Sequence, residues 1–227
     1  MKGLNWKIEA AKKVLEKAFS RFERIGFAWT GGKDSTLVLH LAREMKIKQG
    51  KKDFPYPVIF IDHGLHFEET LEFIEKLKKT WKLNLFVFPK EKEEIEKIKS
   101  LPLEKQKEKV RFLKIEGIRQ AVKNLNLQAL VVGIRWDEHE ARAREKFFSK
   151  REDHVRVHPI LPFTEADVWE YIKQFHVPYN PLYDRGYRSI GEKPFTKPVL
   201  DPSLPERAGR EKEKEEMMEK LRKLGYF

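Results

Sequence analysis

The hydrophobic pattern of the chain alternates between short apolar runs and longer segments in which apolar residues recur at helical spacing. The short runs, typical of buried parallel strands, are residues 27–29, 58–61, 83–88 and 130–133. The longer segments, which predict amphipathic helices, are residues 4–24, 67–81 and 110–125, together with a stretch that starts near residue 35. This alternation predicts an α/β fold, with a parallel sheet and helices on both faces.

The carboxyl-terminal part of the chain differs in composition from the rest. A strand over 155–158 and a helix that Thr164 opens as its N-cap complete the first unit, which we expect to span residues 1–176. Residues 179–191 are rich in turn residues, charges and tyrosines, as binding loops on a rigid scaffold commonly are. A charged helix over 211–224 follows, and its apolar end, 225–227, predicts docking against this or another subunit. We expect residues 177–227 to form a separate loop and helical tail.

The most informative local feature is the turn between the first strand and its helix, residues 30–35, with the sequence Thr-Gly-Gly-Lys-Asp-Ser. Adjacent glycines let the backbone approach an anion, and the N–H groups at the helix start point toward it. Ser35 or Asp34 is expected to cap the helix, and Lys33 adds a positive charge. The spacing differs from that of a Walker A loop. The alternative is a capped turn that binds no ligand.

The predicted strands end in residues suited to one shared site. The first strand leads into the turn at 30–35, the second ends at Asp62, and a later one ends at Gly133. These ends lie along the carboxyl edge of a parallel sheet, where open α/β folds bind their ligands. Asp62 is suited to a ribose hydroxyl or a magnesium-bound water, or else it only starts an Asx-turn.

A cluster of arginines follows the strand that ends at Gly133, a glycine that permits close approach of backbone or ligand. Arg135, Arg142 and Arg144 carry planar guanidinium groups that match phosphate or sulfate oxygens. Arg135 and Arg142 are seven positions apart, so a helix would place both on one side, facing one anion. The alternative is a surface helix with a Glu138–Arg142 ion pair.

Composition narrows the classes of function. The chain has 227 residues and a formal net charge of +11, which favours an acidic partner or substrate. It contains no cysteine, so disulfides, zinc thiolate sites and a cysteine nucleophile are excluded. The mixed Lys and Glu content of residues 89–109 favours a solvated helix or flap over nucleic-acid binding. No signal-peptide core or long apolar run is present, so we expect a cytoplasmic protein with no membrane partner, and its charge-rich surface resembles those of thermophiles.

Residues 30–35 resemble the Ser-Gly-Gly-x-Asp-Ser loop of the PP-loop ATP pyrophosphatases, with Thr30 in place of the usual serine. The segments 61–64, 133–143 and 157–169 recur in the same order in the branch that handles adenylyl sulfate and phosphoadenylyl sulfate (PAPS). The resemblance implies a Rossmann-like, adenine nucleotide alpha hydrolase-like fold. It also implies cleavage of ATP between its α and β phosphates, with magnesium on the phosphates and AMP passed to an acceptor.

Two groups within the PAPS reductase family compete as the nearest relatives. The segment 206–210, Glu-Arg-Ala-Gly-Arg, and the end of the chain look like the small subunit of ATP sulfurylase, sulfate adenylyltransferase subunit 2. The loop 177–191 is similar to PAPS reductases and to FAD synthetases. Reductases of this family attack the substrate sulfur with a cysteine, which this chain lacks. His63 and Trp136 also depart from the family pattern.

We therefore hypothesise an ATP-dependent adenylyltransferase of sulfate assimilation, which adenylates sulfate and has either a larger GTPase partner or a homo-oligomeric state. The alternatives are an FMN adenylyltransferase, a tRNA-modifying enzyme, and a non-catalytic protein that binds adenylyl sulfate or PAPS. No residue is assigned as a metal ligand. The predicted catalytic residues are Lys33, Arg135 and Arg142; the nucleotide-binding residues are Thr30, Gly31, Gly32, Lys33, Asp34, Ser35, Asp62 and Gly133; the acceptor-binding residues are Arg135, Arg142, Arg144, Arg185 and Arg188.

Overall fold

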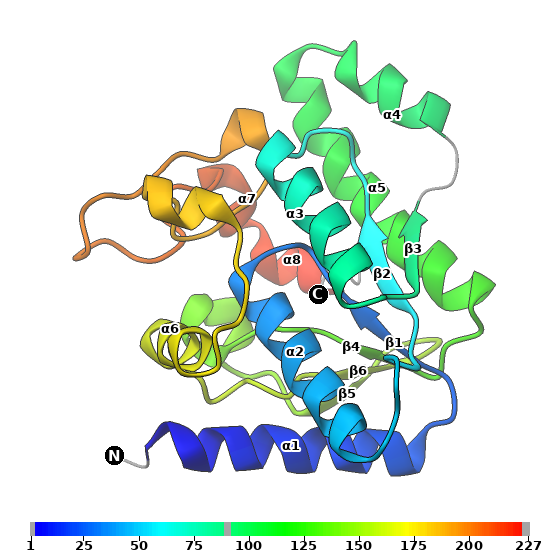
Figure 1. Ribbon diagram of the computed structural model, residues 1–227. Helices are drawn as coiled ribbons and strands as arrows, with labels where there is room; N and C mark the ends of the chain where they lie inside the picture. Colours follow the sequence, from blue (N-terminus) through cyan, green and yellow to red (C-terminus); the bar gives the residue numbers. More distant parts are fainter. Residues whose placement is uncertain (1–2, 89–91, 224–227) are drawn as a thin grey trace.

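The computed structural model describes residues 3–88 and 92–223, which fold around a six-stranded sheet (Figure 1). The strands are β1 (Ile25–Ala28), β2 (Val58–Ile61), β3 (Leu85–Phe88), β4 (Ala129–Val131), β5 (Phe148–Lys150) and β6 (Val155–Val157). Their order in the sheet is β3-β2-β1-β4-β6-β5, and all neighbours are parallel except β5 and β6. The α/β prediction is therefore confirmed, with one antiparallel strand at the edge.

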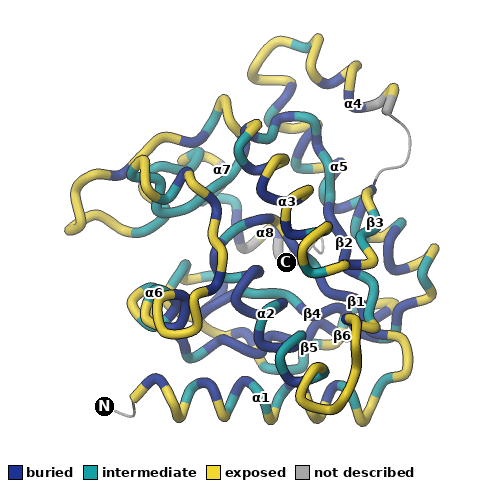
Figure 2. The backbone as a smooth tube through the Cα atoms, viewed as in Figure 1, coloured by how far each residue is buried: buried dark blue, intermediate teal, exposed yellow. Residues whose placement is uncertain are grey.

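Helices cover both faces of this sheet. One face carries α1 (Leu4–Arg21), α2 (Lys33–Lys48), α3 (Glu68–Thr80) and α6 (Glu165–Gln174), whose apolar sides form the main core with the strands. The other face carries α5 (Leu103–Asn124), which packs Ala121 and Val122 on Ile59 and Leu130. Figure 2 shows the outer side of α1 exposed and its inner side buried, as the helical spacing of its apolar residues predicts.

The charged segment before α5 is helical. Residues 92–99 form α4 (Lys92–Lys99), and α5 begins at Leu103, earlier than residue 110, where apolar spacing alone placed its start. Ile98 of α4 is buried against Leu65 and Val110, so these few apolar residues are enough to dock the segment. The segment for which a solvated helix or a flap was predicted therefore consists of α4 and the first part of α5.

Two further predictions on element boundaries need correction. The single tail helix over 211–224 is wrong, because the structure has two short helices there, α7 (Lys212–Glu216) and α8 (Met218–Lys223). The strand β5 was missed, because only one of its three residues is apolar. The predicted docking of 225–227 lies outside the described residues. Among the described helices, none combines the length and the apolar composition that crossing a membrane requires.

The helix that Thr164 opens is confirmed in detail. The Thr164 hydroxyl accepts the N–H of Asp167, and the Asp167 carboxylate accepts the N–H of Thr164, which satisfies two donors at the start of α6. Lys7 of α1 also contacts Asp167, so this cap is tied to the neighbouring helix.

Candidate functional site

A cavity of about 220 Å³ opens at the carboxyl ends of β1, β2 and β4. Part of its lining is apolar and consists of Ala28, Ile59 and Leu130 of the strands and Ile118 of α5. Its rim is polar and comes from the turn before α2, from the segment after β4 and from the carboxyl-terminal part of the chain. The shared site predicted at this sheet edge therefore corresponds to a cavity with two chemically different ends.

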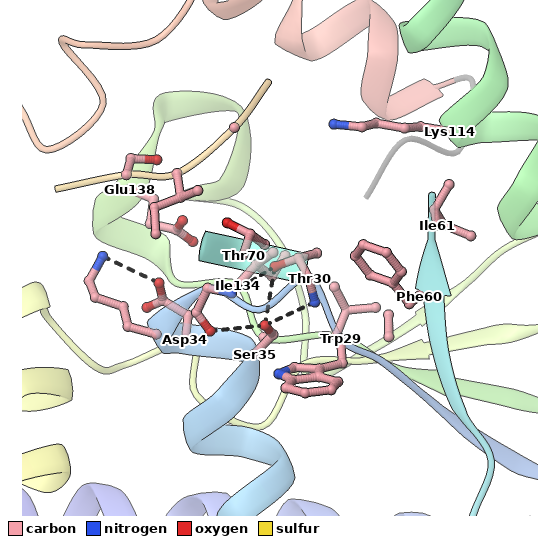
Figure 3. A pocket seen from close by; sticks show the side chains of 18 of the residues that line it. Trp29, Thr30, Asp34, Ser35, Phe60, Ile61, Thr70, Lys114, Ile134 and Glu138 are labelled. Carbon is pink, nitrogen blue, oxygen red and sulfur yellow. Dashed lines mark hydrogen bonds and ion pairs between the residues drawn. The ribbon is translucent and has the colours of Figure 1, made fainter. Parts of the chain in front are cut away.

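The turn at residues 30–35, here called the anion turn, forms one side of the cavity (Figure 3). Gly31 has φ of +73°, a left-handed conformation that glycine adopts without strain. The prediction that Ser35 or Asp34 caps α2 is wrong, because Gly32 is the N-cap residue and makes no side-chain cap. The Ser35 hydroxyl instead accepts the Thr30 N–H at 3.2 Å and donates to the Gly32 carbonyl at 3.1 Å, which holds the turn closed on itself.

Gly133 lies where β4 leads directly past the start of α2. A Cβ at this position would lie 2.8 Å from the carbonyl oxygen of Asp34 and 2.9 Å from the Cα of Ser35. Real side chains do not fit at such distances from backbone, so only glycine permits this approach. Of the two roles predicted for Gly133, the close approach of backbone is the one found.

Lys33 and Asp34 of the anion turn belong to a buried ion cluster. The Lys33 ammonium contacts the carboxylate of Glu206 and donates to the Arg188 carbonyl at 2.9 Å, with Asp34 3.4 Å away. Arg135 donates to Asp34 at 2.6 Å and also contacts Glu206. Lys33 is 1% exposed and Arg135 0% exposed. The two cations and the two shared carboxylates thus balance one another away from water.

This cluster sets the charge state of its members. Burial opposes ionisation of Asp34, but Lys33 and Arg135 outweigh it and hold the pKa of Asp34 at about 2. Burial also opposes the charged form of Lys33, yet Asp34, Tyr183 and Glu206 raise its pKa above the ordinary value. For Glu206 burial is the largest influence, and its carboxyl pKa is raised. The cluster therefore keeps Lys33 charged and makes Glu206 its most readily protonated acid.

Arginines form the outer rim of the cavity. Arg142, in the short 3-10 helix η2 (Glu140–Arg142), donates to Glu138 at 2.5 Å. Arg207 donates to both oxygens of Glu215, at 2.6 and 2.7 Å. Arg210, also from the tail, lines the cavity with them. The rim thus carries three arginines, each paired with a glutamate, and two of them come from beyond residue 200.

The side of the cavity across from the anion turn carries further basic groups. Lys114 of α5 donates to Glu192 at 2.7 Å and lines the cavity near His66 (Figure 3 labels Lys114). The rings of His63 and His66 stack with centroids 3.7 Å apart. Burial, with the charge of Lys114, lowers the pKa of His66 to about 4, so this histidine is neutral at physiological pH.

The structure brings part of the predicted site together. Of the predicted residues, those that line the cavity are Thr30, Gly32, Lys33, Asp34, Ser35, Gly133 and Arg142. Gly31, Asp62, Arg135, Arg144, Arg185 and Arg188 are not among its lining residues.

The residues outside the lining have other contacts. Arg185 pairs with Glu69 on the surface, and Arg188 donates to Glu165 at 2.6 Å. Asp62 accepts the N–H of Gly64 at 2.9 Å, which is the Asx-turn alternative. Arg135 and Arg142 do not share one helix, because residues 136–142 form two separate 3-10 helices, η1 (Trp136–Glu138) and η2.

Several residues of the site were not predicted from the sequence. Tyr183, in the 3-10 helix η3 (Pro181–Arg185), accepts the backbone N–H of Lys33 at 2.8 Å. Glu206, Arg207 and Arg210 belong to a segment whose composition alone marks only a charged tail. The Glu-Arg-Ala-Gly-Arg motif at 206–210, which resembles the small subunit of ATP sulfurylase, is the sequence signal that could have identified them.

Comparison with known proteins supports the expected resemblance. The sequence profile of the phosphoadenosine phosphosulfate reductase domain matches residues 24–198. Adenosine 5′-phosphosulfate reductase of Staphylococcus haemolyticus is 33% identical over 218 residues, which are 89% of this chain and 82% of that protein. Sulfate adenylyltransferase subunit 2 of Sulfurovum sp. is 30% identical over 241 residues, or 94% and 77% of the two chains.

A solved structure shows the same fold. FMN adenylyltransferase of Candida glabrata in complex with ATP has a TM-score of 0.68 at 22% identity, covering 88% of this chain and 66% of that chain. The profile match begins just before β1 and ends beyond η3, so it includes every strand of the sheet, the anion turn and the arginine segment after β4. The chain therefore belongs to the phosphoadenosine phosphosulfate reductase domain family.

Proposed function

We propose that this protein is an ATP-dependent adenylyltransferase that passes AMP to a small oxyanion, sulfate above all, and releases pyrophosphate. The observation that carries the proposal is the cavity, in which an apolar slot between the sheet and α5 leads to a helix start and an arginine rim. An adenine ring suits the apolar slot, and phosphoryl oxygens suit the helix N-terminus and the guanidinium groups. A nucleotide combines such an apolar ring and phosphoryl groups in one molecule.

The proposed reaction needs little covalent chemistry from the protein. A sulfate oxygen attacks the α-phosphorus of ATP, the bond from that phosphorus to the α–β bridging oxygen breaks, and pyrophosphate leaves with the electron pair. The protein positions the two anions and offsets the charge that develops on the leaving group. In this proposal Arg142 acts at the phosphates together with Arg207 and Arg210, which line the same cavity, and Lys33 offsets phosphate charge from within the buried ion cluster.

Magnesium fits the chemistry of the available donors. Asp34, Glu138 and Glu206 each offer a carboxylate oxygen, and these oxygens lie within 4.8 Å of one another. Magnesium commonly binds one or two carboxylates together with substrate phosphates. Asp34 and Glu138 are the residues that would hold it, since both line the cavity and Glu206 is not among its lining residues. The ion would supply further neutralisation of phosphate charge.

Reduction of a sulfonucleotide is not the function we propose, although relatives named as reductases are as similar as those named as adenylyltransferases. The 227 residues include no cysteine, so the chain itself provides no thiol to attack sulfur. Because one relative is named as a subunit 2, we extend the proposal to a larger partner that drives the unfavourable adenylation of sulfate.

One observation favours a second candidate, FMN adenylyltransferase. The loop 177–191 places Tyr183 directly on the anion turn, and the fold is that of a solved FMN adenylyltransferase. In that case the acceptor is the phosphate of FMN, and residues 177–191 contact it. The remaining predicted acceptor residues, Arg144, Arg185 and Arg188, stay proposals for either acceptor.

The experiment runs the proposed reaction in its favourable direction. Protein, magnesium, adenylyl sulfate and pyrophosphate are mixed, and ATP is measured by a luciferase signal; the proposal predicts ATP formation that sulfate inhibits. The R142Q variant should lose most of this activity, whereas R119Q, altered at an exposed arginine of α5, serves as the matched control. FAD formation from ATP and FMN, with no ATP formation from adenylyl sulfate, would replace the first proposal by the second.

A further inference from the structure

Glu206 lies where the carboxyl-terminal residues meet the anion turn. One carboxylate oxygen contacts the Lys33 ammonium and the other contacts the Arg135 guanidinium. The Glu206 side chain is only 9% exposed, and its two partners are less exposed still. A carboxylate removed from water to this extent is stable only when its oxygens are paired with charge or hydrogen-bond donors. The ion cluster therefore fixes the position of residue 206 in the fold.

The residues that follow Glu206 supply part of the cavity rim. Arg207 and Arg210 both line the cavity. Arg210 donates to the Ile190 carbonyl at 2.6 Å, and Arg207 donates to Glu215, so these hydrogen bonds stay within residues 177–223, which we call the closing segment. Arg207 also lies 3.9 Å from Glu138 of η1, but Glu206 makes closer contacts, with Lys33 of α2 and with Arg135 after β4. Glu206 directly precedes Arg207 in the sequence, so its contacts hold this stretch of the chain at the edge of the sheet.

We propose that Glu206 is a positioning residue: by holding Lys33 and Arg135 it docks residues 206–210 on the anion turn and so places Arg207 and Arg210 where they bind the phosphoryl oxygens of the substrate. This inference rests on the proposed function, in that it takes the ligand of the cavity to be a nucleotide or pyrophosphate. It gives the closing segment a part in the chemistry through one buried carboxylate.

The same contacts also define the rival role, in which Glu206 is a stand-in for the substrate anion and must leave before ATP binds. If Glu206 docks this stretch, its departure would also displace Arg207 and Arg210, which follow it within four positions. The cavity would then lose two cations at the moment when a polyanion enters. Electrostatics therefore favours the docked arrangement, and the two roles predict opposite signs for the effect of neutralising Glu206.

Calorimetric titration with inorganic pyrophosphate tests the sign. We expect E206Q to bind pyrophosphate about tenfold to a hundredfold more weakly than the wild type, in line with the loss that misplacement of binding groups causes. R210Q should weaken binding in the wild type but have little further effect in E206Q, because Arg210 is already misplaced there. E206D, which keeps the charge on a shorter side chain, should recover part of the loss. E213Q, at a tail carboxylate that is 65% exposed, is the matched control and should bind as the wild type does.

Several results would overturn the inference. Tighter binding by E206Q would establish the stand-in role, and additive losses from E206Q and R210Q would show that the two residues act independently. If E206Q does not fold, the same cycle with E206D and R210Q gives the answer.

Tryptic cleavage after Arg207 and Arg210 separates this inference from the proposed function, since it needs no ligand. Faster cleavage in E206Q than in E213Q supports docking by Glu206 even if adenylyl sulfate proves not to be a substrate. Equal cleavage rates in the two variants contradict docking, whatever reaction the protein catalyses.

Discussion

The anion turn and the closing segment form the same cavity but differ in how they are built. The anion turn is local: six consecutive residues at the junction of β1 and α2 form it, and the hydrogen bonds between these residues span no more than five positions. The closing segment has only short helices and is held by contacts over long sequence distances, such as Tyr183 with Lys33 and Glu206 with Arg135. A local turn shapes its backbone through its own hydrogen bonds, whereas a distant segment adds charged side chains to the rim.

The ion cluster joins these two regions, so breaking it should have the largest effect. In R135Q, the carboxylates of Asp34, Asp137 and Glu206 lose a shared, fully buried cation. Removing one partner of a buried ion pair destabilises by about 3–5 kcal/mol, and we expect that loss in the free energy of unfolding. Urea unfolding followed by circular dichroism measures it. R185Q should stay within about 0.5 kcal/mol of the wild type, and an equal loss there would show that the effect is not specific to the cluster.

A change confined to the anion turn should act next in order. In G133A the added Cβ meets the backbone of Asp34 and Ser35, which can move only if α2 shifts. We expect a loss of about 1–3 kcal/mol, together with weaker binding of ATP, because the helix start is displaced. Thermal unfolding and ATP titration measure the two effects. G3A, where nothing lies within 4 Å of the new Cβ, is the control, and equal behaviour of the two variants would contradict the close approach.

The acid limb of stability tests the charges in the cluster. The folded-state pKa of Asp34, about 2, lies below its ordinary value of 3.8, so its ionised form stabilises the fold at higher pH. This contribution, about 2 kcal/mol, should be lost as the pH falls from about 4 through about 2. Urea midpoints measured over that range should fall less steeply in D34N than in the wild type. Parallel curves for the two proteins would show that Asp34 is not held by Lys33 and Arg135.

The smallest expected effect concerns one hydrogen bond between the closing segment and the anion turn. Y183F removes the hydroxyl that accepts the Lys33 N–H at 2.8 Å and leaves the ring in place against Trp169. Loss of one buried hydrogen-bond partner should cost about 1 kcal/mol. Hydrogen exchange at the Lys33 amide should become faster in Y183F, whereas Y179F, altered at a tyrosine that bonds the surface Asp184, should leave that amide unchanged.

The contrast between local and long-range contacts also explains which features of the structure the sequence could predict. The strands at 58–61 and the α6 cap were predictable, because burial and capping depend on a few neighbouring residues. The start of α2 was misassigned to a side-chain cap, since Ser35 has a backbone partner within the turn that spacing does not show. The residues around Asp62 are compatible both with a ligand contact and with an Asx-turn, and the structure shows the hydrogen bond of the Asx-turn.

The closing segment was the least predictable part. Nothing in the charge pattern of residues 192–223 indicates that Glu206 pairs with Lys33 across more than 170 positions, since a tail with alternating charges normally faces water. Arginine is a residue type that often binds anions, yet Arg185 and Arg188 each pair with a glutamate that precedes them in the chain. Pairing of this kind is decided by tertiary contacts, which residue type and spacing do not reveal.

The most direct test of the account is a crystal structure of the protein with magnesium and a non-hydrolysable ATP analogue. The account predicts the adenine between Ile59 or Leu130 of the sheet and Ile118 of α5, with the phosphates between the anion turn and Arg142. It also predicts that Glu206 stays in contact with Lys33. A nucleotide bound elsewhere, or one that displaces residues 206–210 from the anion turn, would contradict it.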